Sequence, residues 1–443
     1  MGRNSAMASA MNTTALARDR LEECLARIDE PSGEGARTFL SLYPEVAREA
    51  ADAADARARD GTPLGPLDGV IVSIKDLFDV AGETTRAGST TLDDAPPARI
   101  DAPVVQRLRN AGAVIVGKTN MSEFAFTGVG ANPHYGTPGN PFDRGRVPGG
   151  SSSGAAVSVA DDMCEIAIGT DTGGSTRIPA ALCGVVGYKP TKERVPTAGA
   201  FPLSPTLDSV GPLARSVKAC AKADAVLAGE LPWALEPAPL SGLRIGIPQG
   251  VPLDELDTEV GSRFEMALDR IAQAGVHLLD RKFALFDDMA RVQSAATIAT
   301  VEAYHIHEER IETRGDAYDP MIRRRIESGS MVSPRDYSAM LGERRKLARA
   351  MDSQLADLEA LVLPTTPIVA STMSDVSDPG VFNENNRLLL RNTAIANFFD
   401  LCAISLPMPG PGGLPAGLML FARRGEDRRL FAIPASIERL LAR

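Results

Sequence analysis

The 443-residue chain has few of the residues on which metal sites and disulfide frameworks depend. It contains only four histidines, and its five cysteines are odd in number, widely spaced and free of a Cys-x-x-Cys pair. This pattern argues against both a disulfide framework and a zinc site, so we expect no bound metal. The cysteines instead suit small buried positions in a reducing compartment.

An excess of positive charge and a long apolar run are also missing. The chain has 47 basic and 57 acidic residues, a net charge of −10, and no basic stripe of the kind that binds phosphate backbones. No stretch approaches the roughly 18 consecutive apolar residues of a membrane span, and the first residues lack the apolar core of a signal peptide. We therefore expect a cytoplasmic protein that binds neither nucleic acid nor membrane.

Several catalytic and cofactor motifs are absent as well. There is no G-x-S-x-G elbow, no G-x-G-x-x-G fingerprint, and no lysine after the glycines of GTDTGGSTR (169–177), as a phosphate-binding loop requires. Of the four histidines, three lie in a predicted strand or a charged helix, where a structural role is favoured. Only His134, in a long loop, is placed to touch a substrate.

What the chain does contain is alternating helix and strand patterns, which are typical of α/β proteins. Helical spacing occurs over 13–28, 45–59 and 101–111, and a buried strand over 70–74 leads directly into Lys75. A strand–helix–strand unit lies near 243–280, and residues 289–358 are mainly helical. With 44% hydrophobic residues, the chain can bury a large core in one domain or two.

Lys75 and two serine-containing segments are the strongest candidates for chemistry. Burial of an ammonium group lowers its pKa, and a neutral amine is a base. The alternative is that Lys75 reaches the surface or pairs with Asp76 or Asp79, and the sequence leaves both possibilities open. GGSSSG (149–154) leads straight into a helical pattern, which favours a fixed helix entrance over a flexible linker.

Five segments in order carry a family resemblance. They are VSIKD around Lys75, NMSEFAFTG (120–128), GGSSSG (149–154), GTDTGGSTRIPAALCGVVGYKPT (169–191) and LDSVGPLARS (207–216). Together they resemble the amidase signature family of serine hydrolases. The resemblance implies an α/β/α sandwich around a central mixed, mostly parallel sheet. Residues 61–443 would form a single domain with a helical cap at about 289–358, and residues 1–60 an N-terminal helical segment that packs on the core or on a dimer partner.

The resemblance also assigns catalytic roles. It implies that Ser175 is the nucleophile, that Ser151, after a cis peptide bond, shuttles the proton, and that Lys75 is the final base. A serine hydroxyl needs such an adjacent base to attack at neutral pH. The backbone N–H groups of Thr172, Gly173, Gly174 and Ser175 would form the oxyanion hole, while Asp171 and Arg177 brace the loop.

The predicted activity is that of a cofactor-independent amidase, which converts a small-molecule carboxamide to a carboxylic acid and ammonia through an acyl-Ser175 intermediate. By analogy, the substrate pocket would be lined by the stretch from Met121 to Thr127, with Phe124 and Phe126 as an apolar wall, by His134 and Tyr135, and by the turn from Pro364 to Pro367 that contains Thr366. Each of these could equally be a core-packing residue. Two alternatives are a glutaminase subunit of a tRNA-dependent amidotransferase and a non-catalytic binding module that keeps the fold. A homodimer through the N-terminal helices is a further expectation.

Overall fold

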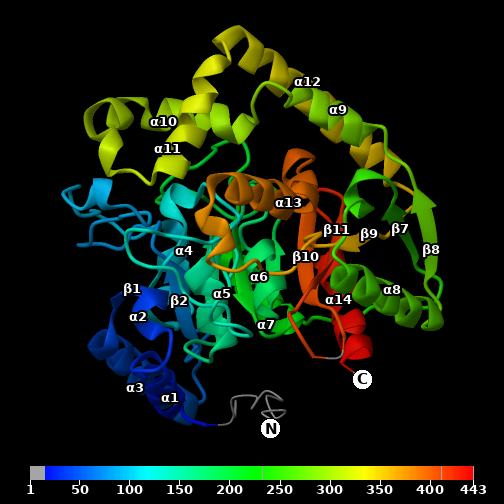
Figure 1. The fold of residues 1–443 in the computed structure, drawn as a ribbon. Helices are drawn as coiled ribbons and strands as arrows, with labels where there is room; N and C mark the ends of the chain where they lie inside the picture. Colours follow the sequence, from blue (N-terminus) through cyan, green and yellow to red (C-terminus); the bar gives the residue numbers. More distant parts are fainter. Residues whose placement is uncertain (1–14, 232, 411, 443) are drawn as a thin grey trace.

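The computed structural model describes residues 15–231, 233–410 and 412–442, and it centres on one sheet of eleven strands (Figure 1). The strand order is β1-β3-β2-β4-β6-β5-β10-β11-β9-β7-β8. The strands are β1 (Phe39–Leu42), β2 (Ile71–Lys75), β3 (Val114–Thr119), β4 (Ile166–Thr170), β5 (Val186–Lys189), β6 (Val210–Ala214), β7 (Arg244–Pro248), β8 (His277–Arg281), β9 (Ala360–Pro364), β10 (Cys402–Pro407) and β11 (Gly417–Ala422).

The sheet is mixed, as predicted, but the expectation that it is mostly parallel is wrong. Six of its ten strand pairings are antiparallel. The parallel pairings join β2 to β3 and β4, and β7 to β8 and β9. Parallel neighbours need a crossover connection, whereas β10 and β11 are consecutive strands joined by a loop and therefore pair antiparallel.

Helices cover both faces of the sheet, which gives three layers. The helices are α1 (Ala17–Ile28), α2 (Gly35–Thr38), α3 (Pro44–Asp60), α4 (Pro103–Asn110), α5 (Ser153–Ala160), α6 (Arg177–Cys183), α7 (Val217–Ala228), α8 (Thr258–Gln273), α9 (Leu285–Val292), α10 (Ile298–Arg314), α11 (Pro320–Glu327), α12 (Pro334–Gln354), α13 (Pro379–Phe398) and α14 (Asp427–Leu441). One face packs against α4, α7, α8 and α14. The opposite face packs against α1, α3 and α5 at one end and against α9, α12 and α13 at the other.

The alternation of side chains along the strands explains this layering. In β9, Ala360 and Val362 join the core cluster of one face, and Leu361 and Leu363 join the cluster of the other. Successive strand residues point to opposite faces, so a strand that is apolar throughout must be covered on both sides. The uninterrupted apolar character of β9 therefore requires helices above and below it.

The N-terminal segment predicted as helical, residues 1–60, also contributes a strand. Its first 14 residues lie outside the described part of the chain. β1 pairs antiparallel with β3 and forms one edge of the sheet, while α1 and α3 pack beside it. This segment therefore extends the central sheet, in addition to supplying helices.

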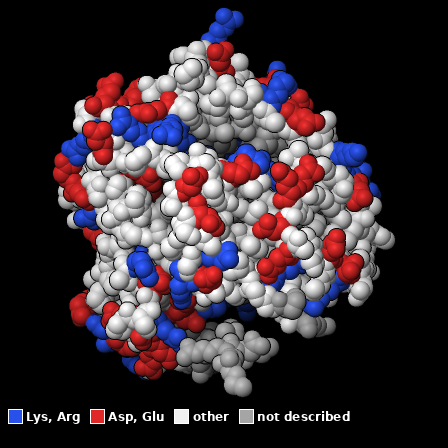
Figure 2. Space-filling model, in the orientation of Figure 1, with Lys and Arg blue, Asp and Glu red and all other residues white. Residues whose placement is uncertain are grey.

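The helical region predicted at about 289–358 contains α9 to α12, which lie along the top of the molecule in Figure 1. Figure 2 shows acidic and basic side chains interspersed over the same view, without a continuous basic patch on this face. Within the described ranges, no helix combines the length and the apolar character needed to cross a membrane.

Candidate active site

Lys75 ends the buried strand β2 and is fully enclosed by protein. Its Nζ atom donates hydrogen bonds to Ser151 Oγ at 2.8 Å and to Thr170 Oγ1 at 2.9 Å. The carboxylates that act on its charge are those of Asp171 and Asp208, and its hydrogen bonds in the described structure go to the two hydroxyls, so the alternative of pairing with Asp76 or Asp79 does not hold. Burial lowers the pKa of Lys75 to about 7.

Ser151 lies at the entrance to α5, immediately after a cis peptide bond between Gly150 and Ser151. The backbone N–H of Gly150 donates to the carbonyl oxygen of Gly128 at 2.8 Å, and that of Ser122 donates to the carbonyl oxygen of Ser151 at 3.1 Å. A Cβ atom at position 150 would lie 2.8 Å from the Gly130 backbone. The GGSSSG segment is therefore a fixed, tightly packed turn, as predicted.

Ser175 lies in the loop between β4 and α6 and is 4% exposed. The backbone N–H of Ser152 donates to the carbonyl oxygen of Ser175 at 3.3 Å, so the two serine segments adjoin. The fold thus brings together the three predicted catalytic positions, which come from three separate parts of the chain. Lys75 reaches Ser151 through a hydrogen bond, and Ser151 is adjacent in sequence to the residue that contacts Ser175.

The backbone of the predicted oxyanion loop leaves its donors free. None of the N–H groups of Thr172, Gly173, Gly174 and Ser175 donates a hydrogen bond to another part of the chain that the structure describes. Gly174 has φ of +141°, and the Thr393 hydroxyl donates to the carbonyl oxygen of Gly173 at 2.6 Å. Free backbone donors beside a serine are the arrangement that stabilises a developing oxyanion.

Asp171 and Arg177 brace this loop, which confirms their predicted structural role. The Arg177 guanidinium donates to both carboxylate oxygens of Asp171, at 2.8 and 3.0 Å, and the Asn397 amide donates to the same carboxylate at 2.9 Å. Burial alone would raise the pKa of Asp171, but the Arg177 charge and these hydrogen bonds hold it well below its ordinary value.

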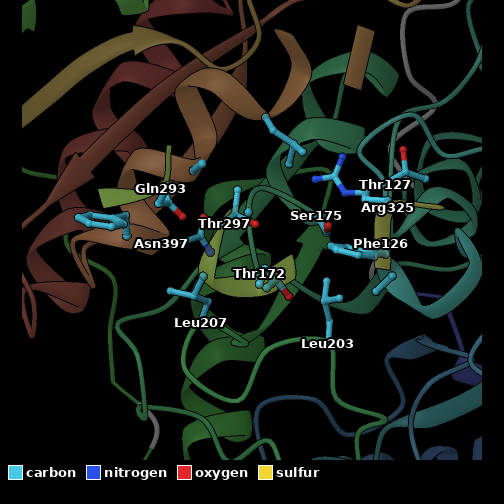
Figure 3. Close-up of a pocket in the computed structure, with 16 residues that line it drawn as sticks. Phe126, Thr127, Thr172, Ser175, Leu203, Leu207, Gln293, Thr297, Arg325 and Asn397 are labelled. Atoms are coloured by element: carbon cyan, nitrogen blue, oxygen red, sulfur yellow. The ribbon is translucent and has the colours of Figure 1, made fainter. Parts of the chain in front are cut away.

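A pocket with an empty volume of about 630 Å³ opens beside Ser175 (Figure 3). The catalytic loop contributes Thr172, Gly173 and Ser175 to its wall. The rest of the wall is mainly apolar and consists of Ala125, Phe126, Thr127, Leu203, Leu207, Gln293, Thr297, Ala299, Arg325, Leu390, Ala394, Asn397 and Phe398. A mainly apolar wall with a few polar groups is typical of a small-molecule site.

Of the residues predicted to line the pocket, Phe126 and Thr127 do so, and Met121, Phe124, Tyr135 and Thr366 do not. Phe124 packs instead against His307, with ring centroids 4.3 Å apart, in a buried aromatic cluster. The Met121 side chain is fully buried, and the hydroxyl groups of Tyr135 and Thr366 donate to Asp93 at 3.2 Å and to the carbonyl oxygen of Ile368 at 2.9 Å. Tyr135 is only half-buried, and its contact with Asp93 lies at the surface. The local pattern in the sequence does not distinguish any of these directions from the pocket direction.

His134, the one histidine that the sequence placed near a substrate, does not line the pocket. Its Nε2 atom lies 2.8 Å from Glu123 Oε1, so the ring pairs with a buried carboxylate. Within the described ranges, no group of three or more His, Cys, Asp or Glu side chains could hold a metal ion.

The sequence alone does not identify the wall residues that come from the cap and from the loop before β6. Gln293, Thr297, Ala299 and Arg325 belong to the predicted helical region, and Leu203 and Leu207 precede β6. Leu207 opens the segment LDSVGPLARS, which was the only sequence signal for any of them. The way the helices of the cap pack over the loop between β4 and α6 determines which side chains of the cap reach Ser175.

Comparisons with known proteins agree with this geometry. The amidase family model matches residues 19–431. The 2-amino-5-chloromuconic acid deaminase of Comamonas testosteroni is 36% identical over 402 residues, which cover 89% of this chain and 86% of that protein. A glutamyl-tRNA(Gln) amidotransferase subunit of Chloroflexus aurantiacus is 34% identical, with coverage of 95% and 92%.

A solved structure extends the agreement to the whole fold. A crystal structure of an amidase superposes with a TM-score of 0.87 and 32% identity, and the match covers 96% of both chains. The match to the family model takes in all three predicted catalytic positions and the cap. The chain therefore belongs to the amidase family and is a hydrolase of amide carbon–nitrogen bonds.

Proposed function

We propose that the protein hydrolyses a small-molecule carboxamide to a carboxylic acid and ammonia, with Ser175 as nucleophile, Ser151 as proton relay and Lys75 as base. The observation that carries this proposal is the hydrogen bond between Lys75 Nζ and Ser151 Oγ in a fully buried setting. A lysine whose pKa lies near 7 is partly neutral at physiological pH, and only the neutral form can accept a proton.

In the acylation step, neutral Lys75 takes the proton of Ser151, and Ser151 takes the proton of Ser175. The Ser175 oxygen then bonds to the amide carbon, and the backbone N–H groups of 172–175 bind the resulting oxyanion. The proton returns through Ser151 to the amide nitrogen, the carbon–nitrogen bond breaks, and ammonia leaves. A water molecule then attacks the acyl-Ser175 ester by the same relay in reverse, which releases the acid and restores the serine.

Substitutions at the three catalytic positions test the relay. We expect Ser151→Ala, Lys75→Met and Ser175→Ala each to lower the rate of ammonia release from simple amides by about 1,000-fold or more, because each removes a group that acts as part of one unit. Ser153→Ala is the matched control, since the Ser153 hydroxyl makes only a 3.5 Å contact with the carbonyl oxygen of Asn120. Near-normal ammonia release by folded Lys75→Met protein would exclude the proposed base.

A second candidate function is that of a glutaminase subunit, which the similarity to the amidotransferase protein favours. Such a subunit must bind both charged groups of glutamine, the α-carboxylate and the α-ammonium group. Three polar residues lie close together on α13: Arg391 donates to the carbonyl oxygen of Asp254, Asn392 donates to those of Pro252 and Pro364, and of the three only Asn397 lines the pocket. Strict dependence on glutamine, together with copurification of a partner protein, would select this function over the first.

A further inference from the structure

Arg325 is the one charged residue among the sixteen that line the pocket beside Ser175. It lies on α11, in the helical cap, and its side chain forms part of the pocket wall next to Phe126. Figure 3 shows Arg325, Ser175 and Phe126 as neighbours in this view. The centre of the guanidinium is 4.8 Å from the centroid of the Phe126 ring, which is a cation–π distance.

The Arg325 guanidinium has no anionic partner among the described residues. Its Nε atom is buried without a hydrogen-bond acceptor, and no carboxylate pairs with its terminal nitrogens. Burial lowers the pKa of Arg325 to about 10, so the group still carries its charge at neutral pH. The fully buried Arg177, by contrast, meets the Asp171 carboxylate.

A charge withdrawn from water without a partner is costly, and an anion bound beside it removes that cost. The guanidinium is planar and matches a carboxylate with two parallel N–H donors. The same pocket wall has no aspartate or glutamate, so an ammonium group of a ligand would find no counter-ion there. The pocket is thus suited to a ligand with a negatively charged group and not to one with an ammonium group.

We infer that the amide substrate carries a carboxylate that binds Arg325 while its carboxamide lies at Ser175, and that it carries no ammonium group. This inference rests on the proposed function, because it takes Ser175 as the position of the scissile amide. The substrate class is that of monoamides of dicarboxylic acids. Glutamine and asparagine are excluded by their α-ammonium group.

The surroundings of Arg325 hold it in place for such a role. α11 begins at Pro320, and the Asp319 side chain caps it by accepting from the backbone N–H of Met321 at 2.8 Å. The backbone N–H of Asp319 in turn donates to the buried Glu123 carboxylate at 2.8 Å. Glu123 belongs to the turn that carries Phe126, so the helix with the guanidinium and the ring beside it are fixed to each other.

Matched ligands test this inference by binding alone, in the Ser175→Ala protein, so that turnover is not required. Succinamate and butanamide differ only by a carboxylate in place of a methyl group, as do glutaramate and pentanamide. Glutamine is glutaramate with an added α-ammonium group. By calorimetry we expect each acid amide to bind about 10- to 100-fold more tightly than its neutral counterpart, and glutaramate at least about 10-fold more tightly than glutamine.

Substitution of Arg325 should remove the preference itself. Arg325→Met should bring the ratio of acid amide to neutral amide close to one, and Arg325→Lys should leave an intermediate ratio because charge remains but the planar pair of donors is lost. The matched control is Arg324→Met, since Arg324 is the preceding residue of the same helix and is exposed. This control should keep the full ratio.

Three results would overturn the inference: equal binding of acid and neutral amides, equal effects of Arg325→Met and Arg324→Met on the ratio, or no binding of any of the five compounds. Failure of the proposed function is a separate outcome. In that case the wild-type protein would release no ammonia from the acid amides even though the binding preference for them is present.

Discussion

Lys75 owes its expected basicity to its surroundings. Burial lowers the pKa of its ammonium group, and the nearby carboxylates of Asp171 and Asp208 raise it only in part, which leaves a value of about 7. From the sequence, a lysine at the end of a buried strand could have been either a base or a surface residue. Its hydrogen bonds to Ser151 and Thr170 depend on contacts between positions about 76 and 95 residues apart, which strand periodicity does not specify.

The pKa of Lys75 predicts the pH dependence of the reaction. In the proposed relay only the neutral amine accepts a proton, so kcat/KM should rise with pH by about tenfold per unit below pH 7 and level off above it. A pH profile of ammonia release between pH 5 and 9 measures this. A flat profile over that range would show that no group with a pKa near 7 acts as the base.

The loop from β4 to α6 is the element whose structure was predicted most fully from the sequence. Its glycines predicted a bend that exposes backbone N–H groups, and the structure leaves those of 172–175 without protein acceptors among the described residues. The brace of Asp171 and Arg177 was also expected from their types and spacing. Local spacing suffices here because all of these groups lie within seven residues of one another.

Gly174 offers a test of this element. A Cβ atom at this position would overlap the Thr393 hydroxyl, and φ of +141° disfavours any side chain. We expect Gly174→Ala to displace the loop and to lower kcat by about 100-fold, the usual cost of losing an oxyanion donor. The control is Gly261→Ala in α8, where a Cβ atom meets nothing within 4 Å.

The two glycine variants should also differ in stability. Gly261→Ala should raise the free energy of unfolding by about 0.5–1 kcal/mol, because alanine loses less entropy than glycine in a helix. Gly174→Ala should lower it by about 1–3 kcal/mol, the usual cost of overpacking. Urea unfolding measures both changes, and unchanged kcat in folded Gly174→Ala protein would contradict the assigned role of the loop.

The helices of the cap could be predicted from the sequence, but the cap residue that lines the pocket could not. Helical spacing identified residues 289–358 as mainly helical, and α9 to α12 largely fill that range. The sequence did not single out Arg325 among Arg323, Arg324 and Arg325. Arg323 pairs with Glu327, Arg324 is exposed, and Arg325 lines the pocket. The direction of each side chain depends on how α11 packs over Phe126, which the sequence does not specify.

At the scale of the whole molecule, the sheet joins elements that the sequence alone does not order. The family resemblance implied a mostly parallel sheet, and parallel pairing is found for β2 with β3 and for β7 with β8, the strand–helix–strand unit that the sequence pattern predicted. β5 pairs antiparallel with both β6 and β10, and the pairing with β10 joins the strands β1 to β6 to the strands β7 to β11 in one sheet. Nothing in the local patterns encodes these partners. The complete fold brings the cap residues Gln293 and Arg325 into one pocket with Ser175.

We propose that Ser175 forms the covalent acyl intermediate with help from Lys75. Peptide mass spectrometry of enzyme quenched during hydrolysis of a slowly deacylating amide tests it most directly. We expect an acyl group on Ser175 in the wild-type protein, no adduct in Ser175→Ala, and greatly slowed adduct formation in folded Lys75→Met. An acyl group on any other residue, or steady ammonia release by Ser175→Ala, would contradict it.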